Sequence, residues 1–182
     1  MREELDKLLV EKFPKLFRDR YAPMTETCMC WGFSHGDGWF NILDALCSNI
    51  EHHVKWKREQ RARALVYNRR LKRAISAQNV SYMLPPKATT WQIQEAEEAM
   101  ALGEYRGVPE KVQHVRVVQV KEKFGTLRFY YDGGDDYVSG LVSMAESMSA
   151  ITCEECGVPG KTGGNGWIRT LCDSCRTKRE EV

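Results

Sequence analysis

Residues 113–134 read QHVRVVQVKEKFGTLRFYYDGG, a stretch in which apolar and polar side chains alternate. The apolar positions are Val115, Val117, Leu127, Phe129 and Tyr131. A period of two is typical of strands that bury one face. Gly125 lies at the point of reversal, where a turn needs a residue that tolerates positive φ. The stretch therefore predicts a β-hairpin, with strands at about 113–122 and 126–132.

The segments on either side of this hairpin have helical periodicity instead. Residues 3–17 carry apolar side chains at helical spacing, and Pro14 is expected to kink or restart that helix. A second helix is expected to begin near Trp39, with Asp37 as its N-cap, and to continue into a basic stretch. A third amphipathic helix is predicted over about 136–150.

The region of about 55–105 has a different character from its surroundings. Residues 51–80 contain nine Lys or Arg and only two Glu. Thr90 is expected to cap a short acidic helix that ends near Leu102. The basic and acidic segments are complementary in charge and could pack together as an arm. We interpret this region as a charged helical insertion in a smaller core.

Two Cys-x-x-Cys pairs give the strongest motif in the sequence. Residues 153–157 read CEECG and positions 172–175 read CDSC, so fifteen residues separate Cys156 from Cys172. Two such pairs at this separation are typical of a tetrahedral zinc site, and the glycine-rich segment between them suits a hairpin. Four thiolates close the coordination sphere, so the predicted zinc is structural. Its ligands are Cys153, Cys156, Cys172 and Cys175.

These elements predict an α+β fold: a β-hairpin or small antiparallel sheet, packed with three or four helices and extended by a C-terminal zinc ribbon. Residues 1–150 are expected to form the core domain, with the insertion inside it. Residues 151–182 are expected to form the zinc-ribbon module.

The composition of the 182 residues is that of a globular protein. Hydrophobic residues make up 42%, charged residues 29%, and the formal net charge is +2. No apolar run has the length of a membrane span, and the N-terminus is too charged for a secretory signal. We therefore expect a soluble cytoplasmic protein without a membrane partner. The sequence leaves open whether it is a monomer or a homo-oligomer.

The segment of residues 28–40, CMCWGFSHGDGWF, is the first candidate for a binding site. A glycine-rich loop that leads into a helix can present backbone N–H groups to an anion, and tryptophans can stack on a base. The alternative is that the glycines make turns and the aromatic side chains belong to the core. A second metal held by Cys28, Cys30, His35 or Cys47 would match no common ligand spacing.

The hairpin itself is the second candidate, because three of its cations lie beside aromatic residues. Cations with aromatics suit phosphate and base recognition, although solvated lysines on a packed hairpin explain them equally well. Arg128 lies within a strand, so we expect a carboxylate or a phosphate to order it. Together the two segments predict a ligand site that comprises Gly36, Asp37, Trp39, Lys121, Lys123 and Arg128.

Catalysis has little support in the sequence. It contains no Gly-x-Ser-x-Gly, no P-loop and no His-Glu-x-x-His. His35 and Asp37 could form an acid–base pair, but two residues in one loop are weak grounds for an enzyme.

Several motifs together resemble a group of small, uncharacterised proteins that tailed phages and prophages encode. The motifs are FPKLF at 13–17, CWGF at 30–33, GDGW at 36–39, LDALC at 43–47, VKEKFGTLRFY at 120–130, and the cysteine pairs. The likeness covers both ends of the chain and leaves out the insertion. It implies the cytoplasm of an infected bacterium and an accessory role, and it transfers no catalytic residue.

The leading hypothesis is a non-enzymatic phage accessory protein that counters host defence by sequestering a small, phosphate-bearing nucleotide ligand. A second hypothesis is a zinc-ribbon protein that binds nucleic acid in phage transcription or recombination, through the ribbon and the basic helix at 55–73. A third is a protein inhibitor of a host defence enzyme, with the insertion as its contact surface. A hydrolase that uses His35 and Asp37 is the fourth, and it requires turnover.

Overall fold

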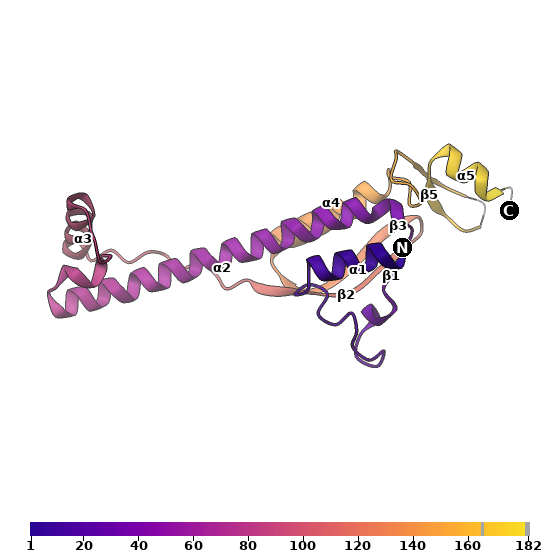
Figure 1. Cartoon of the computed structure of the whole chain (residues 1–182). Coiled ribbons are helices and arrows are strands. Elements are labelled where there is room, and N and C mark those ends of the chain that lie inside the picture. Colours follow the sequence, from indigo (N-terminus) through magenta and orange to yellow (C-terminus); the bar gives the residue numbers. More distant parts are fainter. Residues whose placement is uncertain (165, 181–182) are drawn as a thin grey trace. The chain divides into compact units, whose positions relative to one another are not determined.

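The computed structural model describes residues 1–164 and 166–180. Within these residues the structure contains five α-helices, a three-stranded sheet and a separate two-stranded sheet, and Figure 1 labels most of these elements. The predicted α+β class is thereby confirmed. Contacts divide the chain into two compact units, and the ribbon lies in the same unit as the core. Unit 1 comprises residues 1–54 and 112–182, and unit 2 comprises residues 55–111.

The larger sheet is built on the predicted hairpin. Strand β2 (Gln113–Lys123) pairs antiparallel with β3 (Thr126–Gly134), and Val120 lies opposite Phe129. A two-residue strand, β1 (Phe33–Ser34), pairs parallel with β2 on its other side. The sheet is therefore mixed, with order β1-β2-β3, because the glycine-rich segment adds a short strand that the sequence did not predict.

The turn of the hairpin consists of two residues with left-handed backbone. Phe124 has φ +54° and Gly125 has φ +79°. Two consecutive residues with positive φ are what a two-residue type I′ turn requires, because its twist matches that of the strands. The Gly125 N–H donates to the Glu122 carboxylate at 2.6 Å, which closes the turn.

Helix α1 (Glu3–Lys12) is shorter than the sequence predicted. Phe13 leaves the helical region because it precedes Pro14, and residues before proline disfavour α backbone. The helix over 3–17 is thus corrected to one helix followed by turns. Leu16 and Phe17 stay in the core from this turn segment, where the Leu16 carbonyl accepts the Val117 N–H at 2.9 Å.

Helix α2 (Phe40–Ala77) runs for 38 residues, preceded by a short 3-10 turn, η2 (Asp37–Trp39). The predicted start near Trp39 is confirmed. The prediction that Asp37 caps the helix is wrong, because Arg2 takes its carboxylate. The Arg2 backbone N–H donates to Asp37 at 2.7 Å, and the Arg2 guanidinium forms a second, shorter bond.

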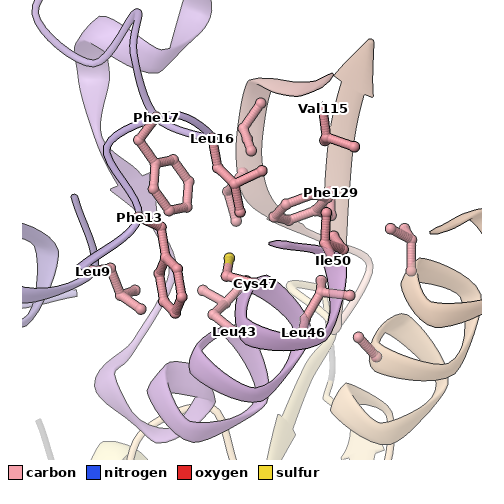
Figure 2. Close-up of a cluster of buried hydrophobic side chains, with 14 of the residues drawn as sticks. Leu9, Phe13, Leu16, Phe17, Leu43, Leu46, Cys47, Ile50, Val115 and Phe129 are labelled. Carbon is pink, nitrogen blue, oxygen red and sulfur yellow. The ribbon is translucent and has the colours of Figure 1, made fainter. Parts of the chain in front are cut away.

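The core of unit 1 lies between these helices and the sheet. Leu43, Cys47 and Ile50 belong to the inward stripe of α2; in Figure 2, Leu43 and Cys47 lie beside Phe13, and Ile50 lies beside Phe129. Val115 and Phe129 supply the sheet side. Each fully buried aliphatic or aromatic side chain contributes roughly 1.5–3 kcal/mol, so this cluster is the main stabilising element.

Helix α4 (Asp136–Ser149) packs one face on the same core, with Val138 and Val142 buried. Asp135 caps it by accepting the Val138 N–H at 3.3 Å. His53 of α2 lies 2.9 Å and 3.0 Å from the two Asp135 carboxylate oxygens, and its ring stacks on Tyr137.

Unit 2 contains the distal part of α2, the 3-10 turn η3 (Val80–Met83) and helix α3 (Thr90–Leu102). The predicted acidic helix is confirmed, but Thr89 rather than Thr90 caps it, in a capping box with Gln92. Asn68 and the backbone of Arg106 exchange two hydrogen bonds of 2.8 Å, which tie the returning chain to α2. Across residues 1–164 and 166–180, no helix has the length and apolarity needed to cross a membrane.

Candidate metal centre

The four cysteines come together at one end of the ribbon. A knuckle at 153–157 supplies Cys153 and Cys156. Strands β4 (Lys161–Gly163) and β5 (Arg169–Leu171) form the predicted hairpin. Cys172 follows β5 directly, and Cys175 lies in the first turn of helix α5 (Asp173–Glu180). The four Sγ atoms all lie within 4.8 Å of one another.

The spacing of the sulfur atoms fits a tetrahedral metal ion. The Sγ of Cys156 is 3.7 Å from that of Cys172 and 3.6 Å from that of Cys175. Four sulfurs at 2.3 Å from a tetrahedral zinc ion would be about 3.8 Å apart. A disulfide would require about 2 Å, so the cysteines are arranged to bind a metal ion rather than each other.

The thiols of Cys153 and Cys175 differ in how readily they ionise. Burial opposes ionisation of Cys153, but backbone N–H groups of Cys172, Cys156 and Glu155 outweigh it and lower its pKa to about 7. The hydrogen bond to Cys172, with burial, raises the pKa of Cys175 to about 12. The Cys153 thiolate therefore forms readily, whereas ionisation of Cys175 at neutral pH would need a bound cation.

Glu154, between two of the ligands, fastens the ribbon to the glycine-rich loop. Its side chain is almost completely buried, and it accepts hydrogen bonds from the Gly36 N–H at 3.0 Å and the Arg169 guanidinium at 2.8 Å. Its backbone carbonyl accepts the Gly38 N–H at 2.7 Å. The loop thus supplies two backbone N–H groups, and both bind this glutamate instead of a free anion.

The glycines of the GDGW segment are needed because the knuckle lies against them. A Cβ on Gly38 would lie 2.5 Å from the Gly157 nitrogen and 2.8 Å from that of Cys156, and closer still to the Cys153 carbonyl. Trp39 is completely buried, and its indole N–H donates to the Thr152 carbonyl at 2.9 Å. This segment therefore belongs partly to the core, through Trp39, and partly to the surface against which the ribbon packs, through Gly38.

The hairpin tip meets the ribbon on another side. The buried Thr170 hydroxyl donates to the Gly125 carbonyl at 2.6 Å. A Cβ on Gly125 would lie 2.9 Å from the Thr162 side chain and 3.2 Å from that of Ile168. The two sequence segments that we singled out therefore converge, since β1 pairs with β2, and the ribbon contacts both.

The predicted cations of the hairpin lie on its outer face. Lys121 is paired opposite Arg128, and Lys123 opposite Thr126, so their side chains share one side of the sheet. Arg128 is ordered by a carboxylate, as expected from the sequence: its guanidinium lies 3.7 Å from Glu146. The Lys121 ammonium lies 5.3 Å from the centre of the Tyr130 ring.

His35 is buried between Phe33 and Trp39 rather than paired with Asp37. Its Nδ1–H donates to the Gly36 carbonyl at 2.7 Å, while its Nε2 is buried without a hydrogen-bond partner among the described residues. Burial lowers the pKa of His35 to about 4, so the ring is neutral at physiological pH. A buried ring of this kind serves the core, and it gives the hydrolase hypothesis no support.

Sequence reasoning missed Glu154, Thr170 and the conformation of Phe124. In the sequence, a glutamate between two zinc-ligand cysteines looks like a solvated turn residue, so nothing nearby indicates that Glu154 is buried. The two-residue length of the hairpin turn is a signal, because type I′ geometry requires positive φ at both positions. In the part of the chain that the structure describes, the four ribbon cysteines form the only cluster suited to a metal ion.

Comparisons of the chain with protein-family models, with curated proteins and with solved structures gave no match.

Proposed function

We propose that this chain is a non-enzymatic protein that binds single-stranded nucleic acid where the β2–β3 hairpin meets the ribbon. The surface concerned comprises Lys121, Lys123, Phe124 and Trp167, and we call it the tip surface. Phe124 precedes the glycine that contacts Ile168, and Trp167 precedes Ile168 in the chain. Both aromatic residues therefore flank the same junction.

The observation that carries the proposal is that Phe124 is exposed and has a left-handed backbone. Its side chain is 68% exposed, and its backbone is left-handed, a conformation that costs non-glycine residues roughly 1–2 kcal/mol. Asparagine or glycine would form the same turn with less strain. Neither the turn nor the core calls for a phenylalanine here, whereas a nucleobase would gain a stacking partner.

Trp167 and the lysines complete the surface. Trp167 is 75% exposed, the largest exposure of any bulky apolar side chain in the described residues. The Lys123 ammonium lies 5.4 Å from the centre of the Phe124 ring, and Lys121 lies on the same face of the hairpin. Aromatic faces beside mobile cations are the usual elements of sequence-tolerant single-strand binding.

We propose zinc as the metal of the ribbon, because four thiolates at tetrahedral spacing suit a soft-ligand, four-coordinate ion without an open position. The metal would hold the knuckle closed and so fix the ribbon against Gly38 and the hairpin tip. In our proposal the setting is that of a phage accessory protein in the cytoplasm of an infected bacterium, as the sequence resemblance implies.

Fluorescence anisotropy with a labelled oligothymidylate of about twelve nucleotides tests the proposal. Phe124→Asn keeps the turn and removes the ring, and Trp167→Ala removes the second aromatic face. Each should weaken binding about tenfold, since stacking contributes roughly 1–3 kcal/mol per base. Lys123→Gln should weaken binding and lower the slope of log affinity against log salt by about 0.7.

The matched control is Trp91→Ala, which removes a tryptophan that is 69% exposed but lies on α3 in unit 2. It should leave the affinity unchanged. Equal losses in the control, or no loss in Phe124→Asn and Trp167→Ala, would overturn the proposal. Arg69→Gln with Arg70→Gln tests the basic helix: a loss confined to that pair would move the interface to unit 2.

A free mononucleotide is the remaining probe. If it binds as tightly as the oligonucleotide, the sequestration of a small nucleotide is favoured and our proposal fails. If it competes only at a concentration about a hundredfold higher, several stacked bases are required, as the tip surface implies.

A further inference from the structure

Helix α4 carries more apolar surface than its packing in one protomer uses. Its buried face consists of Val138, Val142, Ala145 and Ser149. A second apolar row, which we call the outer stripe, comprises Tyr137, Leu141, Met144 and Met148 of the helix and Ile151 of the turn that follows it. The two rows are offset by one or two residues, and each residue advances a helix by about 100°. A helix that packs on one side needs an apolar band of only about 100°.

The outer stripe is exposed along most of its length. Tyr137 is 56% exposed, Met144 57%, Met148 44% and Ile151 67%. Its residues follow one another at spacings of four, three, four and three. This is the spacing of a coiled-coil seam, which packs against a second helix of the same kind.

We propose that the outer stripe is the interface of a homodimer, in which α4 of one protomer packs antiparallel against α4 of a second copy. The four exposed side chains would bury roughly 100 Å² each, or about 800 Å² over both copies, and flanking serines bring the total near the 1,000 Å² of a specific interface. The dimer is therefore expected to be weak and dependent on concentration.

The charges near the stripe favour two copies in antiparallel orientation. Asp135 and Asp136 lie at the N-terminal end of α4, so a parallel pair would bring four carboxylates together. Glu146 is the remaining acid of the helix, and it is engaged by the Phe129 N–H and by Arg128. The antiparallel arrangement separates the acidic ends and opposes the two helix dipoles.

The antiparallel geometry makes a positional prediction. Met144 lies at the centre of the stripe, seven residues from each end, so it would meet its own copy at the two-fold axis. Tyr137 would instead lie beside Ile151 of the second copy. Two Tyr137 residues would then be separated by about 21 Å along the helix axis, because each helical residue rises about 1.5 Å.

Sedimentation equilibrium of the full chain, from about 1 to 200 µM, tests whether the dimer exists. The average mass should rise toward twice the chain mass in wild type, and Met148→Lys should keep the mass of a monomer throughout. Leu102→Lys is the matched control, since Leu102 is also apolar and exposed but lies on α3. A monomeric wild type, or a dimer that survives Met148→Lys, would overturn the proposal.

Cross-linking with a short bis-maleimide tests the geometry, with wild type as the baseline for the seven native cysteines. Met144→Cys should give a covalent dimer above that baseline, and Tyr137→Cys should not. Efficient cross-linking of both variants would indicate parallel helices and refute the antiparallel interface. Circular dichroism of each variant before the experiment establishes that the helices are intact.

Discussion

Gly38→Ala offers the sharpest test of the close packing between the cysteine knuckle and the glycine-rich loop. The added methyl group would lie 2.5 Å from the Gly157 nitrogen, and an ordinary contact is near 3.5 Å, so the knuckle must move by about 1 Å. That movement stretches the 2.7 Å bond from the Gly38 N–H to Glu154. Over-packing costs roughly 1–3 kcal/mol, and a buried group left unpaired a similar amount.

Alanine also lowers the conformational entropy of the unfolded chain, and this effect offsets about 0.4–1 kcal/mol of the lost stability. The expected net loss of stability is therefore about 1–5 kcal/mol. If the knuckle opens to relieve the clash, the same free energy appears as a metal affinity that is about 5- to 5,000-fold lower. Urea unfolding, followed through the hydrogen-exchange protection of β2 and β3 in unit 1, measures the loss of stability, and competition with a chromophoric chelator measures the loss of metal affinity.

The matched control for this variant is Gly140→Ala in α4. A Cβ at Gly140 meets nothing within 4 Å, and alanine is favoured over glycine inside a helix by up to about 1 kcal/mol. The control should thus be slightly more stable than wild type. A Gly38→Ala protein that matches the control in stability and retains its metal equally well would refute the seating of the knuckle on this glycine.

Three further predictions concern the ribbon and the core. Glu154→Gln should destabilise unit 1 by about 1.5–3 kcal/mol in urea unfolding, because it removes the charge from the buried bond to Arg169, which keeps Glu155 as its second partner. Chelation of the metal should abolish hydrogen-exchange protection in β4 and β5 while α3 keeps its own, because only the ribbon depends on the ion. The third concerns His35, whose folded pKa is about 4 against about 6.5 when unfolded. The unfolded state binds the proton first, so wild type should lose up to about 3 kcal/mol relative to His35→Phe as the pH falls from 6.5 to 4. Parallel curves of unfolding free energy against pH for the two proteins would contradict the assignment.

Local patterns predicted the elements that depend on neighbouring residues. The alternation around Gly125 located both strands, and the spacing of the cysteine pairs located the metal ligands. The end of α1 was missed, although Pro14 marks it, because Leu16 and Phe17 are buried from turns that happen to continue helical spacing. An apolar pattern indicates that a side chain is buried, but it does not indicate whether that residue lies in a helix or in a turn.

The role of the glycine-rich segment could not be predicted from local patterns. Gly36 and Glu154 are 118 residues apart, and nothing near Gly36 signals that a carboxylate will arrive there. The same sequence, GDGW, suits a phosphate-binding loop and a seat for a metal knuckle equally well. The hypothesis that the insertion inhibits a host enzyme stays a prediction, because its test needs the partner.

The hydrogen bond between Trp39 and Thr152 also limits when the glycine-rich loop can fold during synthesis. The two residues are 113 positions apart, so at 5–20 residues per second a ribosome makes Thr152 about 6–20 s after Trp39. Throughout that interval the glycine-rich loop lacks the partners that residues 152–154 supply, and it can pack against the knuckle only after those residues have emerged. The loop is therefore the part of unit 1 that completes its packing late in synthesis, and it stays accessible to proteases until the ribbon has folded against it.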